Sequence, residues 1–309
     1  MDFMARLSSK AQYRLEQLNL SLRMKLMNTF WPSDFKRIDS IINGAKPQDI
    51  PGLFKNISID QFGVLLLDVP SRYPNIKNFF PAMPPNKSQD LWTGNHGVTL
   101  LAQSLAFIKT LVAEYNGLTH KSISRAQILD FGCGWGRLTR LLYKYVPYEQ
   151  LYAIDSWEKS IEICRQYGIK ANLAVCDTVP SQIPFQKQFD LIFAFSVFTH
   201  ISEKTATAVL QTLRKYIAAD GLLVITIRPK EFWAIHQDGK HQAEMAQIHN
   251  KKGFAFIPHA IPAIDGDIPY GDASISLEYI RSHFPQWKLE KTITNSTDPY
   301  QTILFLRPA

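Results

Sequence analysis

The sequence has little cysteine and no long apolar run. Its three cysteines, Cys133, Cys164 and Cys176, form no CxxC or Cys/His spacing, which argues against a disulfide framework and a structural zinc site. No segment approaches the roughly 18 apolar residues of a membrane span. Charged residues also stand where a secretory signal would be apolar. We therefore expect a cytoplasmic protein without a membrane span.

The chain also lacks low-complexity segments and dense clusters of basic residues. Hydrophobic residues make up 46% and charged residues 20% of the 309 positions, which is typical of a compact globular protein. The formal net charge of +7 favours anionic partners. No run of basic residues with interleaved aromatics is present, however, and this argues against nucleic acid as a partner.

The first 90 residues differ in pattern from the rest. Leucines recur at three- and four-residue steps between residues 11 and 31, which predicts an amphipathic helix that covers its own domain or contacts a second copy in a homodimer. A helix on a membrane surface is the alternative. Frequent proline and glycine between residues 47 and 85 predict a winding connection with one short strand, Gly63–Val69. We expect an N-terminal extension over residues 1–90 that acts as a lid or in oligomerisation.

From residue 91 onward, helical and strand patterns alternate. Helices are predicted at Val98–Tyr115, Arg137–Tyr145, Glu158–Tyr167, Glu203–Ala218 and Ser274–Phe284, and strands at Gln127–Phe131, Gln150–Ile154, Asn172–Val175, Phe189–Phe195, Leu222–Ile227, Trp287–Asn295 and Tyr300–Leu306. Continuous apolar strands separated by helices predict an α/β fold with a doubly wound, mostly parallel sheet. We expect seven strands with an antiparallel last strand, after a helical N-terminal extension.

The strongest local motif is a glycine-rich turn between a strand and a helix. Ile128–Arg137 reads ILDFGCGWGR, and Gly132, Gly134 and Gly136 let the backbone approach a ligand without an intervening Cβ. Arg137 stands where the dinucleotide fingerprint GxGxxG has its third glycine. This departure, with the absence of a YxxxK proton donor, disfavours an NAD-dependent oxidoreductase.

This motif resembles that of the class I methyltransferase family, and the resemblance covers about 180 residues in order. The next strand ends in Asp155, 25 residues after Asp130, where the family's carboxylate accepts hydrogen bonds from both ribose hydroxyls of S-adenosylmethionine. The resemblance implies S-adenosylmethionine as cofactor. It also implies a set of cofactor-binding residues: Asp130, Gly132, Gly134, Gly136, Asp155, Trp157, Asp177, Phe195 and Trp92.

A general base can assist methyl transfer to an alcohol or an ammonium group. We expect His200, after the fourth strand, or His96, in the loop before a helix, in this role, because the pKa of a free histidine lies near neutrality. His259 and Tyr270 are further candidates. We expect no metal: His236 and His241, with Asp238 nearby, have a spacing that does not share a helix face.

The resemblance and these residues together predict a domain over residues 91–309 that transfers a methyl group to a small molecule. The absence of an Asn/Asp-Pro-Pro-Tyr/Phe signature favours an oxygen acceptor over nitrogen. The long, aromatic segment at about 228–273 is expected to be a substrate-lid insertion, which suits a secondary metabolite or a sugar. The alternative is a catalytically inactive protein that keeps the fold as a binding or scaffold module.

Overall fold

The computed structural model describes residues 18, 22, 33–236, 239, 241–294, 298 and 300–309. The chain folds into two compact units. The N-terminal unit comprises residues 1–126 and 133–174, and the C-terminal unit comprises residues 127–132 and 175–309. The helix predicted over residues 11–31 lies outside the described residues except for Leu18 and Leu22, whose side chains are exposed. A homodimer contact there and a domain boundary near residue 90 stay predictions.

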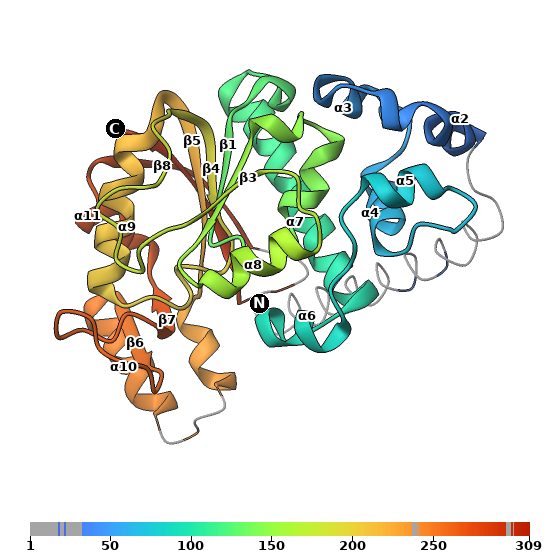
Figure 1. Cartoon of the computed structure of the whole chain (residues 1–309). Helices are drawn as coiled ribbons and strands as arrows, with labels where there is room; N and C mark the ends of the chain where they lie inside the picture. Colours follow the sequence, from blue (N-terminus) through green and yellow to red (C-terminus); the bar gives the residue numbers. More distant parts are fainter. Residues whose placement is uncertain are drawn as a thin grey trace. The chain divides into compact units, whose positions relative to one another are not determined.

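The N-terminal unit begins with a series of mostly short helices. They are α2 (Ser33–Ile41), α3 (Ile50–Leu53), α4 (Ile59–Leu67), α5 (Pro74–Phe79), α6 (Asn86–Thr93) and α7 (Gly97–Thr119), with 3₁₀ turns at Ile42–Gly44, Pro47–Asp49 and Ile123–Arg125 (Figure 1). Proline stands in the first turn of α3 and α5, where its missing N–H needs no partner. Two of the prolines that predicted a winding connection, Pro51 and Pro74, therefore stand at the start of helices.

The strand predicted at Gly63–Val69 is wrong, because most of this segment belongs to α4. The hydroxyl of Ser58 accepts from the backbone N–H of Gln61, and the Gln61 side chain accepts from the backbone N–H of Ser58. This capping box starts a helix. A Cβ on Gly63 would lie 3.0 Å from Cδ2 of Leu105, so the glycine allows α4 to pack closely against α7.

The helix predicted at Val98–Tyr115 is confirmed as part of α7. By length and composition alone, α7 could cross a membrane. A single helix of this kind is weak support for a span, because a core helix has the same composition. In α7 the side chains of Leu105, Ile108 and Leu111 are buried within the N-terminal unit.

The remainder of the N-terminal unit contains β2 (Leu151–Asp155), α8 (Glu158–Gln166) and most of β3 (Asn172–Val175), as predicted. The α-helix predicted at Arg137–Tyr145 is instead the 3₁₀ helix η4 (Thr139–Lys144). Every side chain from Thr139 to Tyr143 is buried. The stretch from Thr139 to Tyr143 has no exposed face, and tertiary packing therefore determines its conformation rather than helical amphipathicity.

The C-terminal unit holds five strands of the main sheet: β1 (Ile128–Phe131), β4 (Phe189–Ala194), β5 (Ile217–Ile227), β8 (Trp287–Thr294) and β9 (Thr302–Pro308). β1 pairs with β4 and β4 with β5 in parallel, whereas β9 is antiparallel to β5 and β8. The strand order is β3-β2-β1-β4-β5-β9-β8. The predicted fold class, a mostly parallel seven-stranded sheet with an antiparallel last strand, is confirmed.

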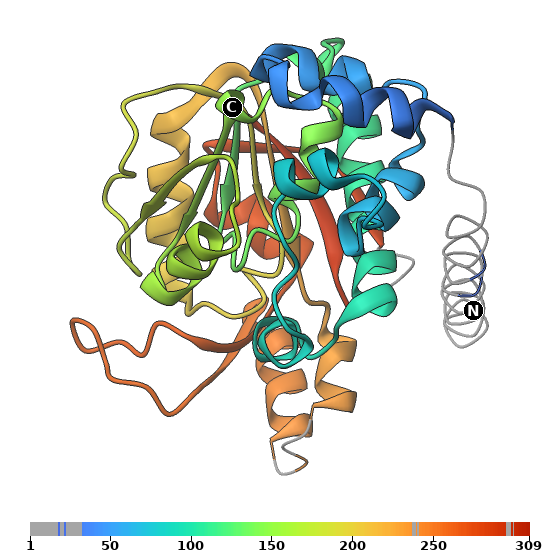
Figure 2. The ribbon, with the colours of Figure 1, turned by 45° about the vertical axis from the view of Figure 1, so that its right-hand side comes forward.

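Between β5 and the last two strands lies a segment with its own small sheet. It contains η6 (Lys230–Ile235), α10 (Gln242–Lys252), β6 (Phe254–Pro258) and β7 (Gly271–Ile275). β6 and β7 form an antiparallel ribbon, and Figure 2 shows the long loop between them extending from it. The helix predicted from Ser274 begins later, as α11 (Leu277–His283), because Ser276 is its N-cap. α9 (Glu203–Tyr216) agrees with the prediction.

Candidate functional site

The glycine-rich turn begins directly after β1. Gly132, at φ +78°, has no room for a side chain, since a Cβ there would collide with Cγ2 of Val197 in the C-terminal unit. The chain then enters the N-terminal unit, where Gly134 has φ +55° and a Cβ would lie 3.3 Å from Cδ1 of Trp92. Both positions therefore favour glycine. Cys133 is buried and its N–H donates to the carbonyl of Ile154 (3.0 Å).

Asp155, at the end of β2, holds this turn. Its Oδ2 accepts from the N–H of Gly134 and its Oδ1 from the N–H of Trp157, each at 2.8 Å. Burial raises the pKa of Asp155, while hydrogen bonds from Trp157, Gly134 and Ser160 act in the opposite direction. The carboxylate thus links β2 to the glycine-rich turn at the carboxyl end of a strand, where α/β folds bind ligands.

Two tryptophans lie beside this carboxylate. The rings of Trp92 and Trp157 are 4.8 Å apart at an interplanar angle of 32°. The indole N–H of Trp92 donates to Oγ of Ser160 (3.0 Å), which fixes one ring, whereas Trp157 is 46% exposed. An aromatic surface next to a carboxylate suits a nucleoside, whose base can stack while its ribose accepts or donates hydrogen bonds.

The predicted base His96 also lies in the N-terminal unit. Its Nδ1 is 2.9 Å from Oδ1 of Asp90, and both side chains are more than 40% exposed. Ion pairs between such exposed groups are weak because water and salt screen them. The Asp90 carboxylate therefore orients this imidazole only loosely.

In the C-terminal unit, the segment after β4 has an unusual backbone. Ser196 has φ +62°, which is uncommon for a residue with a side chain. Its N–H donates to Oγ1 of Thr226 (2.7 Å), and its Oγ contacts Oγ1 of Thr199 and accepts from Nε2 of Gln301. Such conformations gather at functional sites. The predicted cofactor residues Asp130 and Phe195 are buried, and Asp177 is exposed.

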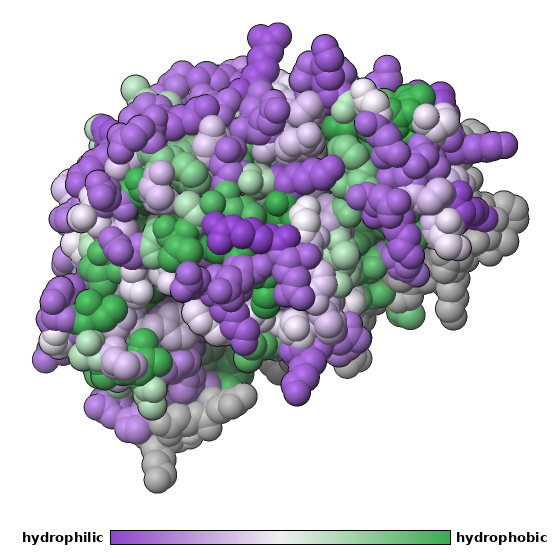
Figure 3. Space-filling view, in the orientation of Figure 1, coloured by the Kyte–Doolittle hydropathy of each residue, from purple (hydrophilic) through white to green (hydrophobic). Residues whose placement is uncertain are grey.

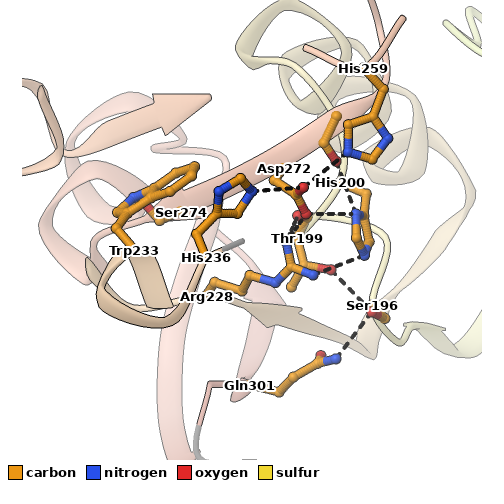
Figure 4. Close-up of polar contacts among 11 residues, drawn as sticks. Ser196, Thr199, His200, Arg228, Trp233, His236, His259, Asp272, Ser274 and Gln301 are labelled. Carbon is orange, nitrogen blue, oxygen red and sulfur yellow. Dashed lines mark hydrogen bonds and ion pairs between the residues drawn. The ribbon is translucent and has the colours of Figure 1, made fainter. Parts of the chain in front are cut away.

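Asp272, on β7, is the centre of a cluster of basic side chains (Figure 4). Its Oδ1 accepts from Nη1 of Arg228 (2.5 Å), and its Oδ2 is 3.2 Å from Nε2 of His236 and 2.9 Å from Nε2 of His259. Nδ1 of His200 lies 3.4 Å from Oδ1. Burial alone would raise the pKa of Asp272, but hydrogen bonds from His259 and Arg228 hold it well below its usual value. The carboxylate therefore stays ionised.

The predicted base His200 has both ring nitrogens engaged. Its Nδ1 is 2.9 Å from the carbonyl of Gly271, so this nitrogen carries the proton. Its Nε2 then accepts from Nη2 of Arg228 (3.1 Å). Burial, followed by the positive charge of Arg228, lowers the pKa of His200 to about 4. His200 is thus a neutral imidazole whose lone pair is already used.

Sequence reasoning identified His200 and His259 but missed Arg228 and Asp272 as their common partners. These two residues are 44 positions apart, and only the packing of the β6–β7 ribbon beside the end of β5 brings them together. Nε2 of His236 contacts Oδ2 of Asp272. Asp238, which we considered with His236 and His241 when we expected no metal site, lies outside the described residues. No three His, Cys, Asp or Glu side chains in the described part of the chain are arranged to hold a metal ion.

Comparison with known families identifies the central part of the chain. Residues 128–221 match the model of a methyltransferase domain. This segment is a class I methyltransferase domain. The match includes β1, the glycine-rich turn, Asp155 and β4, and it confirms the family that the motif resembles.

Curated relatives of this methyltransferase domain are malonyl-[acyl-carrier protein] O-methyltransferases. That of Halalkalibacterium halodurans is 26% identical over 42% of this chain and 50% of the relative. That of Acetivibrio thermocellus is 29% identical over 34% of this chain and 36% of the relative. The chain thus matches half or less of the length of these relatives.

Two of the solved structures to which the chain is similar are methyltransferases by name. An S-adenosylmethionine-dependent methyltransferase from Clostridium acetobutylicum has a TM-score of 0.47 at 14% identity, over 72% of this chain and 96% of that one. A glycopeptide N-methyltransferase, solved with S-adenosylmethionine, has a TM-score of 0.43 at 11% identity, over 64% of this chain and 87% of that one.

Proposed function

We propose that this chain is an S-adenosylmethionine-dependent methyltransferase that acts on an oxygen atom of a small molecule. The observation that carries the proposal is the carboxylate of Asp155, which holds the N–H of Gly134 and remains partly accessible at the end of β2. A carboxylate in this place can accept hydrogen bonds from a ribose diol, and the positive φ of Gly134 leaves backbone open to a ligand.

The residues of the N-terminal unit fit the cofactor. Asp155 would bind the ribose, Gly134 and Gly136 would leave room for backbone contact, and Trp157 with Trp92 would supply an aromatic surface. When bound, S-adenosylmethionine supplies an electrophilic methyl group. Contacts from Asp130, Gly132, Asp177 and Phe195 of the C-terminal unit stay predictions from the family resemblance.

The names of the curated relatives support an oxygen acceptor. The surface near the β6–β7 ribbon favours an acceptor with an apolar part. Ile235, Ile261 and Ile264 are exposed there, and Figure 3 shows apolar patches on this region of the face. A secondary metabolite or a sugar derivative fits this description. Apolar surface of this kind commonly marks a binding site.

Binding of S-adenosylmethionine and S-adenosylhomocysteine, measured by isothermal titration calorimetry, tests the proposal. We expect micromolar affinity for the wild type and a loss of about 30-fold or more in Asp155→Ala, since hydrogen bonds to a charged group contribute about 1.5–3 kcal/mol each. Glu162→Ala, which removes an exposed carboxylate on α8, is the matched control and should bind normally. A wild-type protein that binds neither compound would reject the proposal.

A further inference from the structure

The N-terminal unit encloses a small cavity beside the glycine-rich turn. Its volume is about 20 Å³, which is room for one particle the size of a water molecule, since about 10–15 Å³ holds one. Among its lining side chains, Trp135 and Arg140 carry polar hydrogens. Leucines of α4, α7 and η4 form most of the remaining wall: Leu66, Leu67, Leu100, Leu101 and Leu141.

Arg140 lines this cavity without an acidic partner. The residue is 2% exposed. Its Nη1 contacts Sδ of Met83 (2.7 Å) and its Nη2 donates to the carbonyl of Ala82 (3.1 Å), while its Nε–H has no hydrogen-bond partner in the described part of the chain. Burial lowers the pKa of Arg140 to about 10, and the side chains that act in the opposite direction are Tyr143 and Cys164 rather than an Asp or a Glu. The guanidinium is therefore charged at neutral pH and pairs with no carboxylate of the described residues.

Trp135 supplies a second donor to the same cavity. It stands between Gly134 and Gly136 in the glycine-rich turn and is 2% exposed, and its indole N–H has no hydrogen-bond partner among the described residues. The guanidinium carbon of Arg140 lies 4.9 Å from the centroid of its ring. An aromatic face attracts a cation, but it compensates only part of the cost of burying an unpaired charge. Two donors and one positive charge therefore remain to be satisfied.

The side-chain oxygens that line the cavity already accept hydrogen bonds. Oε1 of Gln89 accepts from the first backbone N–H of α7 (3.2 Å). Oγ of Ser104 accepts from Nη1 of Arg137 (2.8 Å) and donates to a carbonyl within α7. A water molecule could accept from both donors, but its own two hydrogens would then need acceptors. An anion only accepts, and it also compensates the buried charge. The site therefore favours an anion over water.

We propose that this cavity binds a single halide ion, through the Nε–H of Arg140 and the indole N–H of Trp135. The volume leaves no room for phosphate, sulfate or a larger carboxylate, whereas a halide is compact and forms charge-assisted hydrogen bonds with both donors. Because Trp135 is part of the glycine-rich turn, the ion links that turn to the buried guanidinium on η4. The inference concerns the N-terminal unit alone and does not depend on the proposed function.

Thermal unfolding of the full chain in different sodium salts tests the site without any cofactor. We expect Tm to rise by about 2–4 °C as chloride or bromide increases to about 200 mM, with gluconate keeping the ionic strength constant, because the ion binds only to the folded protein. Gluconate is too large for the cavity. Arg140→Met, which keeps a long side chain without the charge, should lose this rise. Trp135→Phe, which removes one donor, should weaken halide binding about tenfold.

Arg125→Met is the matched control. Arg125 is an exposed arginine of the same unit, so its removal should leave the halide-dependent rise unchanged. If Arg140→Met does not fold, the wild type and Trp135→Phe still decide the question. Wild-type crystals soaked in bromide give the position of the ion. An anomalous difference peak should lie within hydrogen-bond distance of both Nε of Arg140 and Nε1 of Trp135.

Four results would overturn the inference. They are a wild-type Tm that does not distinguish chloride from gluconate, an equal rise in Arg140→Met, a water molecule rather than bromide between the two donors, and loss of the bromide peak when S-adenosylhomocysteine is bound. The last result would assign the guanidinium to the carboxylate of the cofactor. Failure of the proposed function looks different: the protein then binds the halide as expected but shows no binding of S-adenosylhomocysteine in calorimetry.

Discussion

Replacing Asp272 by asparagine removes the one negative charge to which Arg228, His236 and His259 all donate. An amide offers one oxygen and one NH₂ group, so it cannot accept on both sides. Either the guanidinium or the two imidazoles then face another donor. Asp272 and Arg228 are 16% and 13% exposed, and breaking a largely buried ion pair costs about 3 kcal/mol. We expect urea unfolding to show a loss of that size at pH 7.

The loss should depend on pH in a defined direction. The pKa of Asp272 is lower in the folded protein than in the unfolded chain. Its contribution is therefore complete above about pH 4, the ordinary pKa of aspartate, and is lost as pH falls through the lower folded value. The difference between wild type and Asp272→Asn should be constant from pH 7 to about 5 and shrink below about pH 4.

Asp265→Asn is the matched control, since Asp265 is exposed in the β6–β7 loop and its positive φ suits asparagine. It should change the free energy of unfolding by less than about 0.5 kcal/mol. A loss in Asp272→Asn that is no larger than in Asp265→Asn, or one that is the same at pH 3 and pH 7, would refute the reasoning about the cluster.

Three further changes have expected outcomes. Gly132→Ala should destabilise the protein by about 2 kcal/mol or more, because the new methyl group collides with Val197 and the backbone has a positive φ. Gly117→Ala, at an open position in α7, should be neutral or stabilising. Thermal unfolding of the two variants measures this difference. In the wild type, the pKa of His200 is about 4, so this histidine binds a proton in the unfolded chain at a higher pH than in the folded protein. The free energy of unfolding should therefore fall by on the order of 3 kcal/mol from pH 6.5 to 4. His200→Gln should remove this dependence on pH in urea unfolding. Trp92→Phe, which deletes an indole hydrogen bond, should lower the free energy of unfolding by about 1 kcal/mol; an unchanged value would contradict that contact.

The strands of the main sheet were predictable because their signal is local. β1 and β4 are fully or largely buried apolar segments between turn residues, and such runs are typical of strands covered on both faces. Asp155 was predictable as the carboxylate that ends the strand β2, and the family resemblance implied its role. Residue type and order were therefore sufficient to locate these strands and this carboxylate.

Other elements depend on contacts that the local pattern does not contain. The segment around Gly63 has the apolar run of a strand, but the capping box at Ser58 and the close approach of α7 make it a helix. The segment after Gly136 has the apolar spacing of an α-helix. Its side chains from Thr139 to Tyr143 are buried all around the helix axis, however, and the segment forms a 3₁₀ helix. In both cases tertiary packing outweighs local propensity.

The histidines of the site show that residue type alone does not determine which ring nitrogen carries the proton. A histidine after a core strand is a reasonable base on sequence alone, but its chemistry depends on which nitrogen holds the proton and which holds the lone pair. At His200 a backbone carbonyl and Arg228 decide this, and they leave no free lone pair. At His259 the carboxylate of Asp272 contacts Nε2, and the side chain is 43% exposed. Arg228 thus has two effects: it donates to Nε2 of His200, and it lowers the pKa of Asp272. Removing Arg228 should therefore free one imidazole and loosen the other, a coupled effect that neither histidine variant alone reproduces.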